Sequence, residues 1–95
     1  MTLTDYIEAG AQKATTVAEL ARIIGTTREH ASAAKSLKKP LPLDSAIKLA
    51  DYIGADRIAV ISANELATEK KEEKRAFWSH LLAAPQTSYI RQMMN

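Results

Sequence analysis

The chain has 95 residues, 46% of them hydrophobic, with only three glycines and three prolines, so it is long enough for one packed domain and too short for two. It contains no cysteine, which excludes disulfides and thiolate metal sites. Its formal net charge of +2 at pH 7 is compatible with an anionic partner but does not require one.

Hydropathy argues against a membrane protein and a secreted one. No apolar run approaches the roughly 18 residues that a membrane span needs, so we expect no membrane partner. The N-terminal stretch MTLTDYIEAG lacks a basic segment followed by an apolar block, which a signal peptide would have. We therefore expect a cytoplasmic protein.

The first expected helix starts at the N-terminus. Thr4 can cap it, and Asp5 would lie at the positive end of the helix dipole. Gly10 lies inside this helix and costs about 1 kcal/mol relative to alanine, so we expect a bend or an end near Lys13.

Residues 15–39 predict two helices joined by a tight turn. Apolar residues recur at helical spacing behind a start at Thr15 and Thr16, and Gly25 stands where that helix has to end. Glycine enters a left-handed cap without steric cost, and Thr27 then offers an N-cap for a second helix beginning at Arg28.

The second of these helices has little to bury. Ala31 and Ala34 are its only candidates for an inward face, and the residues between them are polar or small. Its outward face is short, polar and partly basic, as a helix lying in the major groove of DNA would need.

The segment LKKPLPLD breaks the helical pattern, because Pro40 and Pro42 remove hydrogen-bond donors. A fourth helix is expected from Leu43 or Asp44 to a cap at Gly54. A fifth should start near Asp56. Its expected buried residues are Ile58, Val60 or Ile61, and Leu66.

The charged run TEKKEEKR, residues 68–75, has no apolar face, and we expect a joint near Thr68. A last helix through AFWSHLLAA would end at Pro85, and the tail QTSYIRQMMN has no clear period. No strand pattern appears. The fold class expected is all-α, a bundle of five or six helices.

The run ELARIIGTTREHASAAKSLKKPLPLDSAIKLADYIGAD resembles the Cro and cI repressor-like helix-turn-helix family of phage and bacterial regulators. The resemblance covers roughly residues 3–66 and rests on Leu20 and Ala21 before Gly25, a threonine cap, a polar helix, two prolines and a helix ending in glycine. The charged tail with its FW pair more loosely resembles small Cro-like proteins of filamentous phages. In two respects the chain departs from the family. Many relatives have large aliphatic residues where Ala31 and Ala34 stand, and a glycine at the position of Leu37.

The resemblance implies a lambda-repressor-like helix-turn-helix DNA-binding domain over residues 1–67 and a C-terminal helical extension over 68–95. It also implies a sequence-specific regulator of double-stranded DNA, a phage or prophage repressor that acts as a homodimer on a palindromic operator. The alternative is a protein-interaction module, antitoxin-like or adaptor, that keeps the helix-turn-helix fold.

The candidate DNA contacts lie on the helix that begins at Arg28, in the loop after it, and at the start of the helix before it. Base contacts are expected from Arg28, Glu29, Ser32 and Ser36, and phosphate contacts from Thr16, Thr27, Lys35, Lys38 and Lys39. The competing interpretation is a solvated helix face with solubilising lysines.

The apolar residues of the last helix predict a dimer interface formed by Phe77, Trp78, Leu81 and Leu82. The charged run before them would let this helix reach away from the body of the domain. In the alternative, the helix folds back and Trp78 fills a gap between the first and fifth helices.

No catalytic or metal-binding pattern is present. His30 and His80 do not belong to a known ligand spacing, the serines lack a His and Asp arrangement, and no glycine-rich phosphate loop occurs. We therefore expect a protein without enzymatic activity, metal or cofactor.

Overall fold

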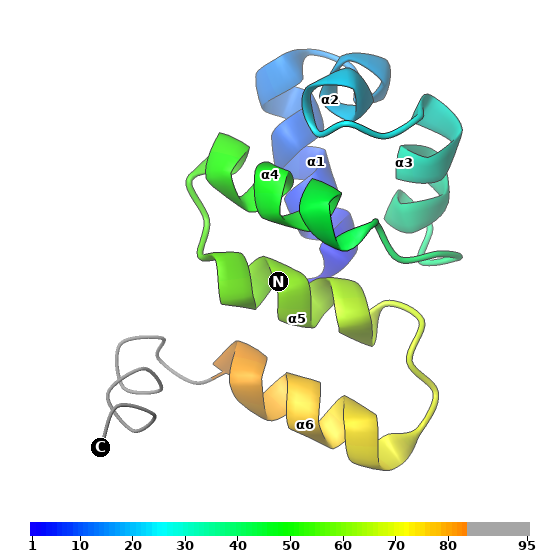
Figure 1. The fold of residues 1–95 in the computed structure, drawn as a ribbon, viewed down its shortest axis with the longest axis vertical. Helices are drawn as coiled ribbons and strands as arrows, with labels where there is room; N and C mark the ends of the chain where they lie inside the picture. Colours follow the sequence, from blue (N-terminus) through cyan, green and yellow to red (C-terminus); the bar gives the residue numbers. More distant parts are fainter. Residues whose placement is uncertain (84–95) are drawn as a thin grey trace.

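The computed structural model describes residues 1–83, and within this range the chain is all-α, with six helices and no strand (Figure 1). The helices are α1 (Leu3–Ala14), α2 (Val17–Ile23), α3 (Arg28–Lys35), α4 (Leu43–Ile53), α5 (Arg57–Leu66) and α6 (Glu72–Ala83). The expected all-α class is confirmed. Pro85 and the tail after it lie outside the described residues.

The helices are stacked along the long axis of the molecule. Figure 1 shows α2 and α3 toward one end, α1 running from that end behind α4 toward α5, α4 and α5 antiparallel to each other in the middle, and α6 running back along α5 at the opposite end. The outer sides of α3 and α6 therefore lie far apart on the surface.

The N-terminal cap of α1 is Thr2, not Thr4 as the sequence suggested. The Thr2 hydroxyl accepts from the Asp5 amide at 3.3 Å and the Asp5 carboxylate accepts from the Thr2 amide at 2.9 Å, which is a capping box. The hydrogen bonds from the Thr2 backbone and side chain lower the pKa of Asp5. Thr4 lies in the first turn instead, and its hydroxyl donates to the Lys35 carbonyl at 2.6 Å, which ties α1 to the end of α3.

α1 ends at Ala14, one residue beyond Lys13, so the expected end is confirmed, and the helix runs through Gly10 without a break. The glycine is buried, and a Cβ atom there would lie 2.8 Å from a methyl group of Leu20 and 2.8 Å from one of Leu49. The close approach of α2 and α4 to α1 therefore requires a residue without a side chain, and this packing gain outweighs its poor helix propensity.

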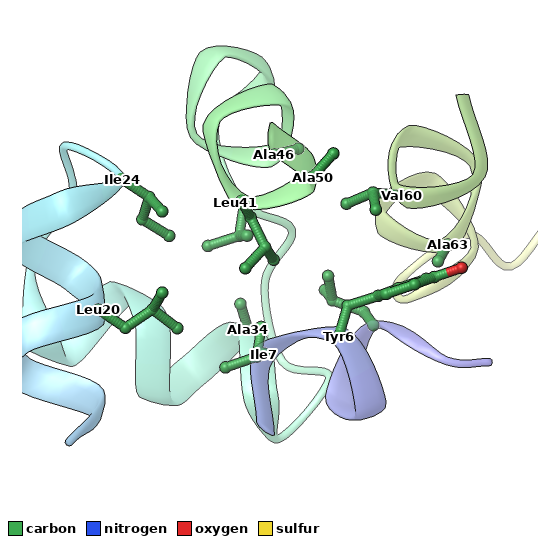
Figure 2. Close-up of a cluster of buried hydrophobic side chains, with 12 residues drawn as sticks. Tyr6, Ile7, Leu20, Ile24, Ala34, Leu41, Ala46, Ala50, Val60 and Ala63 are labelled. Carbon is green, nitrogen blue, oxygen red and sulfur yellow. The ribbon is translucent and has the colours of Figure 1, made fainter. Parts of the chain in front are cut away.

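A single hydrophobic core joins the first five helices (Figure 2). Ile7, Leu20, Ile24, Leu49 and Val60 are fully buried. Alanines at the facing positions, Ala34, Ala46, Ala50 and Ala63, let the helices approach closely.

The buried face of α5 differs from the expected one in all positions except Val60. The buried residues are Val60, Ser62, Ala63 and Asn64, whereas Ile58, Ile61 and Leu66 are only half-buried. The buried side of α5 consists mainly of small and polar residues because α5 packs between α4 and α6. Asn64 can be buried there because it has hydrogen-bonding partners in the interior.

The expected joint near Thr68 is confirmed, since residues 67–71 separate α5 from α6. The expected reach of the last helix away from the body was wrong, because α6 packs along α5. Arg75 helps to hold α6 against α5. Its Nη1 donates to the carbonyl of Leu66 at the end of α5, at 3.1 Å, and to the carbonyl of Glu69 in the joint, at 2.8 Å.

Four residues with positive φ lie in the connections between helices of the described chain. Thr15, with φ of 85°, follows α1. Gly25 and Gly54, with φ of 75° and 71°, follow α2 and α4 as the sequence predicted. Leu37, with φ of 61°, follows α3 and has the same conformation at the position where the resembled family has a glycine. A leucine there is strained, because its Cβ lies too close to the backbone.

We predict that Leu37→Gly stabilises the protein by about 1 kcal/mol, since relief of roughly 1 to 2 kcal/mol of left-handed strain exceeds the loss of a side chain that is 43% exposed. The control is Leu43→Gly, which removes an exposed leucine from the helical conformation of α4 and should lower stability by about 0.5 to 1 kcal/mol. Urea unfolding of the three proteins measures both changes, and equal losses at the two positions would contradict the prediction.

Candidate nucleic-acid interface

The connection between α2 and α3 is built from two threonine caps and a glycine turn. The Thr16 hydroxyl accepts from the Glu19 amide at 3.1 Å and begins α2, and the Thr27 hydroxyl accepts from the His30 amide at 3.1 Å and begins α3. Between them, the Thr26 amide donates to the Ala21 carbonyl at 2.9 Å across Gly25, which closes α2 with a Schellman motif. The predicted helix, turn and helix are therefore present, with the predicted caps at Gly25 and Thr27.

Burial determines which side of α3 faces the solvent. Ala31 and Ala34 are fully buried, as predicted, and Ala34 lies near Leu20 and Ile7 in the core (Figure 2). The residues expected to contact bases, namely Arg28, Glu29, Ser32 and Ser36, are all exposed. Positions 28, 32 and 36 follow one another at four-residue spacing and so lie on one side of the helix.

The cations on this surface have no acidic partner. Within residues 1–83 the ion pairs join Arg22 to Glu19 and Arg57 to Asp51. The hydrogen bond from Arg22 lowers the pKa of Glu19, so that pair stays ionised at neutral pH. Arg28 is in neither pair, and its guanidinium is available to a ligand.

Lys38 and Lys39 lie in the exposed first part of the loop of residues 37–42, which follows α3 and in which Leu41 is buried. The Lys38 amide donates to the Ala33 carbonyl at 2.9 Å and the Leu37 amide to the Ala34 carbonyl at 3.0 Å, so the loop leaves the helix through a second Schellman motif. Both lysines are exposed and neither belongs to the ion pairs described above. The structure thus places two unpaired cations directly after the helix that has Arg28 in its first turn.

The other predicted phosphate contacts lie along the edges of this surface. Thr16 and Thr27 use their hydroxyl oxygens as acceptors in the caps, and each keeps its own proton to donate to a ligand. Lys35 is half-buried and lines a shallow hollow with Thr16 and Gln12, on the side of α3 that faces α1. Thr16 and Lys35 are therefore together, but Lys35 is not on the outward face.

The structure also shows two contacts to the loop that sequence reasoning missed. His30, considered only as a metal ligand, has its Nε2 3.0 Å from the Pro40 carbonyl oxygen. Asn64 on α5 binds both backbone groups of Leu41. Neither contact had a signal in the sequence, because each joins a side chain to a backbone group whose position depends on the fold.

A separate surface lies on α6. Phe77 is 55% exposed and its ring meets that of Trp78 edge to face, with the centroids 5.0 Å apart. Trp78 and Leu82 are half-buried, whereas Leu81 is 7% exposed within the single chain. Of the four residues predicted to form a dimer interface, Phe77 is thus the most accessible and Leu81 already packs inside the chain.

Over residues 1–83 the side chains of histidine and the acidic residues form no group of three or more that could hold a metal ion. None of the helices in this range is long and apolar enough to cross a membrane.

Comparisons of the chain with protein-family models, with curated proteins and with solved structures find no match.

Proposed function

We propose that this protein is a sequence-specific regulator of transcription that binds double-stranded DNA through α3, in the manner of lambda-repressor-like helix-turn-helix proteins. The observation that carries the proposal is the division of α3 into a fully buried alanine edge and an exposed polar face that includes the unpaired Arg28. One side of such a helix packs against the core and its other side is polar. It can therefore enter the major groove while its apolar residues stay buried.

In this function, Arg28 reads a base and the loop lysines bind the backbone. Arginine pairs bidentately with the O6 and N7 atoms of guanine, and its place in the first turn of α3 is where recognition helices reach base edges. Glu29, Ser32 and Ser36 would contact neighbouring bases. Lys38 and Lys39 would bind phosphates, which gives affinity and orientation but no sequence preference.

We further propose that the protein acts as a homodimer that represses by occupying a palindromic operator. Two recognition helices about 34 Å apart would engage one face of the duplex and exclude polymerase or another regulator. The exposed Phe77 on α6 supports pairing through that helix, because aromatic residues are enriched at the centres of interfaces. Because α3 and α6 lie at different ends of the fold, pairing through α6 would leave α3 uncovered (Figure 1).

The alternative is an interaction module that uses the α6 surface to bind another protein. The exposure of Phe77 favours it as well, and the negative charge of Glu29 next to Arg28 weakens the positive surface that DNA needs.

Selection of bound duplexes from a random-sequence library separates the two functions. An enriched palindromic site supports the regulator, and the absence of any enrichment contradicts it.

Arg28→Ala should weaken specific binding by about 1 to 3 kcal/mol and relax the preference at one base pair in each half-site, because alanine cannot make the bidentate hydrogen bonds. Arg28→Lys is the matched variant: it keeps the charge but not the planar fork, so it should retain general affinity and still lose discrimination. Titration against matched and mismatched duplexes measures the ratio, and an unchanged ratio in both variants would remove Arg28 from the base contacts.

Replacing Lys38 and Lys39 by alanine should lower affinity for all duplexes alike and reduce the slope of log K against log salt by roughly 1 for each phosphate that is no longer neutralised. The control is Lys70→Ala with Lys71→Ala, which removes the same charge from the joint before α6. Binding isotherms at several salt concentrations test this. If the two double variants have the same slope, net charge explains the effect and the loop has no contact of its own.

Phe77→Lys should dissociate the dimer with little change in the stability of the single chain, since more than half of this side chain is already exposed there. Leu43→Lys, at a leucine that is 59% exposed on α4, is the control and should leave association unchanged. Sedimentation at tens of micromolar measures both. A wild-type monomer, or a Phe77→Lys protein that still dimerises, would contradict the assignment of this interface.

A further inference from the structure

We propose that His30 and Asn64 are positioning residues that hold the loop of residues 37–42 in the conformation in which Lys38 and Lys39 meet the DNA backbone. The inference rests on the proposed function and assigns a role to two side chains that do not themselves belong to the proposed DNA-contacting face.

Asn64 binds the loop through both ends of its amide. Its Oδ1 accepts from the Leu41 amide at 2.7 Å and its Nδ2 donates to the Leu41 carbonyl at 2.9 Å. Asn64 is 1% exposed and Leu41 is 3% exposed, so water does not compete for either bond. A buried loop backbone without these partners would leave one donor and one acceptor unsatisfied.

His30 holds the same point of the loop from the other side. Its Nε2 lies 3.0 Å from the Pro40 carbonyl oxygen, and because a carbonyl only accepts, this nitrogen is the one that has the hydrogen. The Pro40 carbonyl and the Leu41 amide belong to one planar peptide group. That peptide is therefore held by α3 through His30 and by α5 through Asn64.

These contacts leave the lysine segment little backbone freedom. Before it, the Lys38 amide is bound to the Ala33 carbonyl at 2.9 Å. After it, the Leu41 side chain points into the core between α1 and α4 (Figure 2). Lys38 and Lys39 lie between two fixed points, so binding a phosphate there does not require the loop to be ordered first.

A purely structural role would also account for buried hydrogen bonds, so the test has to separate loop positioning from stability. The variants are His30→Leu, which removes the donor on a half-buried side chain, and His30→Gln, which keeps an amide that can donate to Pro40. Asn64→Ala removes the second contact. Ser62→Ala is its control, because Ser62 is equally buried on α5 and its hydroxyl has no hydrogen-bond partner.

The first measurement needs no DNA. Amide hydrogen exchange of Leu41 should accelerate by about tenfold or more in Asn64→Ala, in conditions where exchange of the core amides of α1 and α4 is unchanged. Ser62→Ala should exchange like the wild type. Unchanged protection of Leu41 in a folded Asn64→Ala protein would overturn the inference.

The second measurement is a double-mutant cycle with the lysines on a duplex of mixed sequence. His30→Leu should lower affinity by about threefold or more and reduce the salt slope, His30→Gln should restore both, and neither variant should have an effect in a protein that already lacks Lys38 and Lys39. An equal decrease in both backgrounds would mean that His30 acts independently of the lysines and would overturn the inference. If the wild type binds no duplex, the proposed function fails and this inference with it; if the wild type binds and all His30 variants match it, only this inference fails.

Discussion

Burial of Ala31 and Ala34 against the core is the constraint on which the rest of the proposed interface depends. Both side chains are fully buried, and a methyl group is small enough for α3 to lie close to α1 and α2. Because a helix is rigid, fixing two positions on one edge fixes the rotation of every other residue about its axis. Arg28, Ser32 and Ser36 are exposed for this reason rather than because of their own polarity.

The same close packing explains several residues that look unfavourable in isolation. Gly10 weakens α1 as a helix, yet it gives the methyl groups of Leu20 and Leu49 the space that a side chain would fill. Thr4 has low intrinsic helix propensity, yet in the first turn of α1 its hydroxyl donates to the Lys35 carbonyl at 2.6 Å and joins α1 to the last turn of α3. Each local cost is offset by a contact that orients the pair α2 and α3.

The loop after α3 connects this interface to α5. The peptide between Pro40 and Leu41 is bound by His30 and by Asn64, so α5 affects the placement of cations that lie on another part of the surface. In turn, Arg75 from α6 binds the carbonyl of Leu66 at the end of α5. A chain of direct contacts thus runs from α6 through α5 to the loop of residues 37–42, and α6 is part of the same folded unit as this loop.

The sequence alone was sufficient for the features that depend on local chemistry. The turn at Gly25, the cap at Thr27, the start of α5 near Asp56, the inward alanines of α3 and the joint near Thr68 follow from helical spacing, backbone freedom and hydrogen-bonding side chains within a few residues. The tertiary structure decided what depends on residues far apart in the chain. It decided that the Thr4 hydroxyl binds the Lys35 carbonyl, 31 positions away, whereas the cap of α1 is local, because Thr2 and Asp5 are three positions apart. It decided that α6 returns along α5 and that Asn64 is buried on Leu41, 23 positions away. Periodicity identifies the side of a helix that is apolar, but the partner that each side meets is determined by the packing of the whole chain.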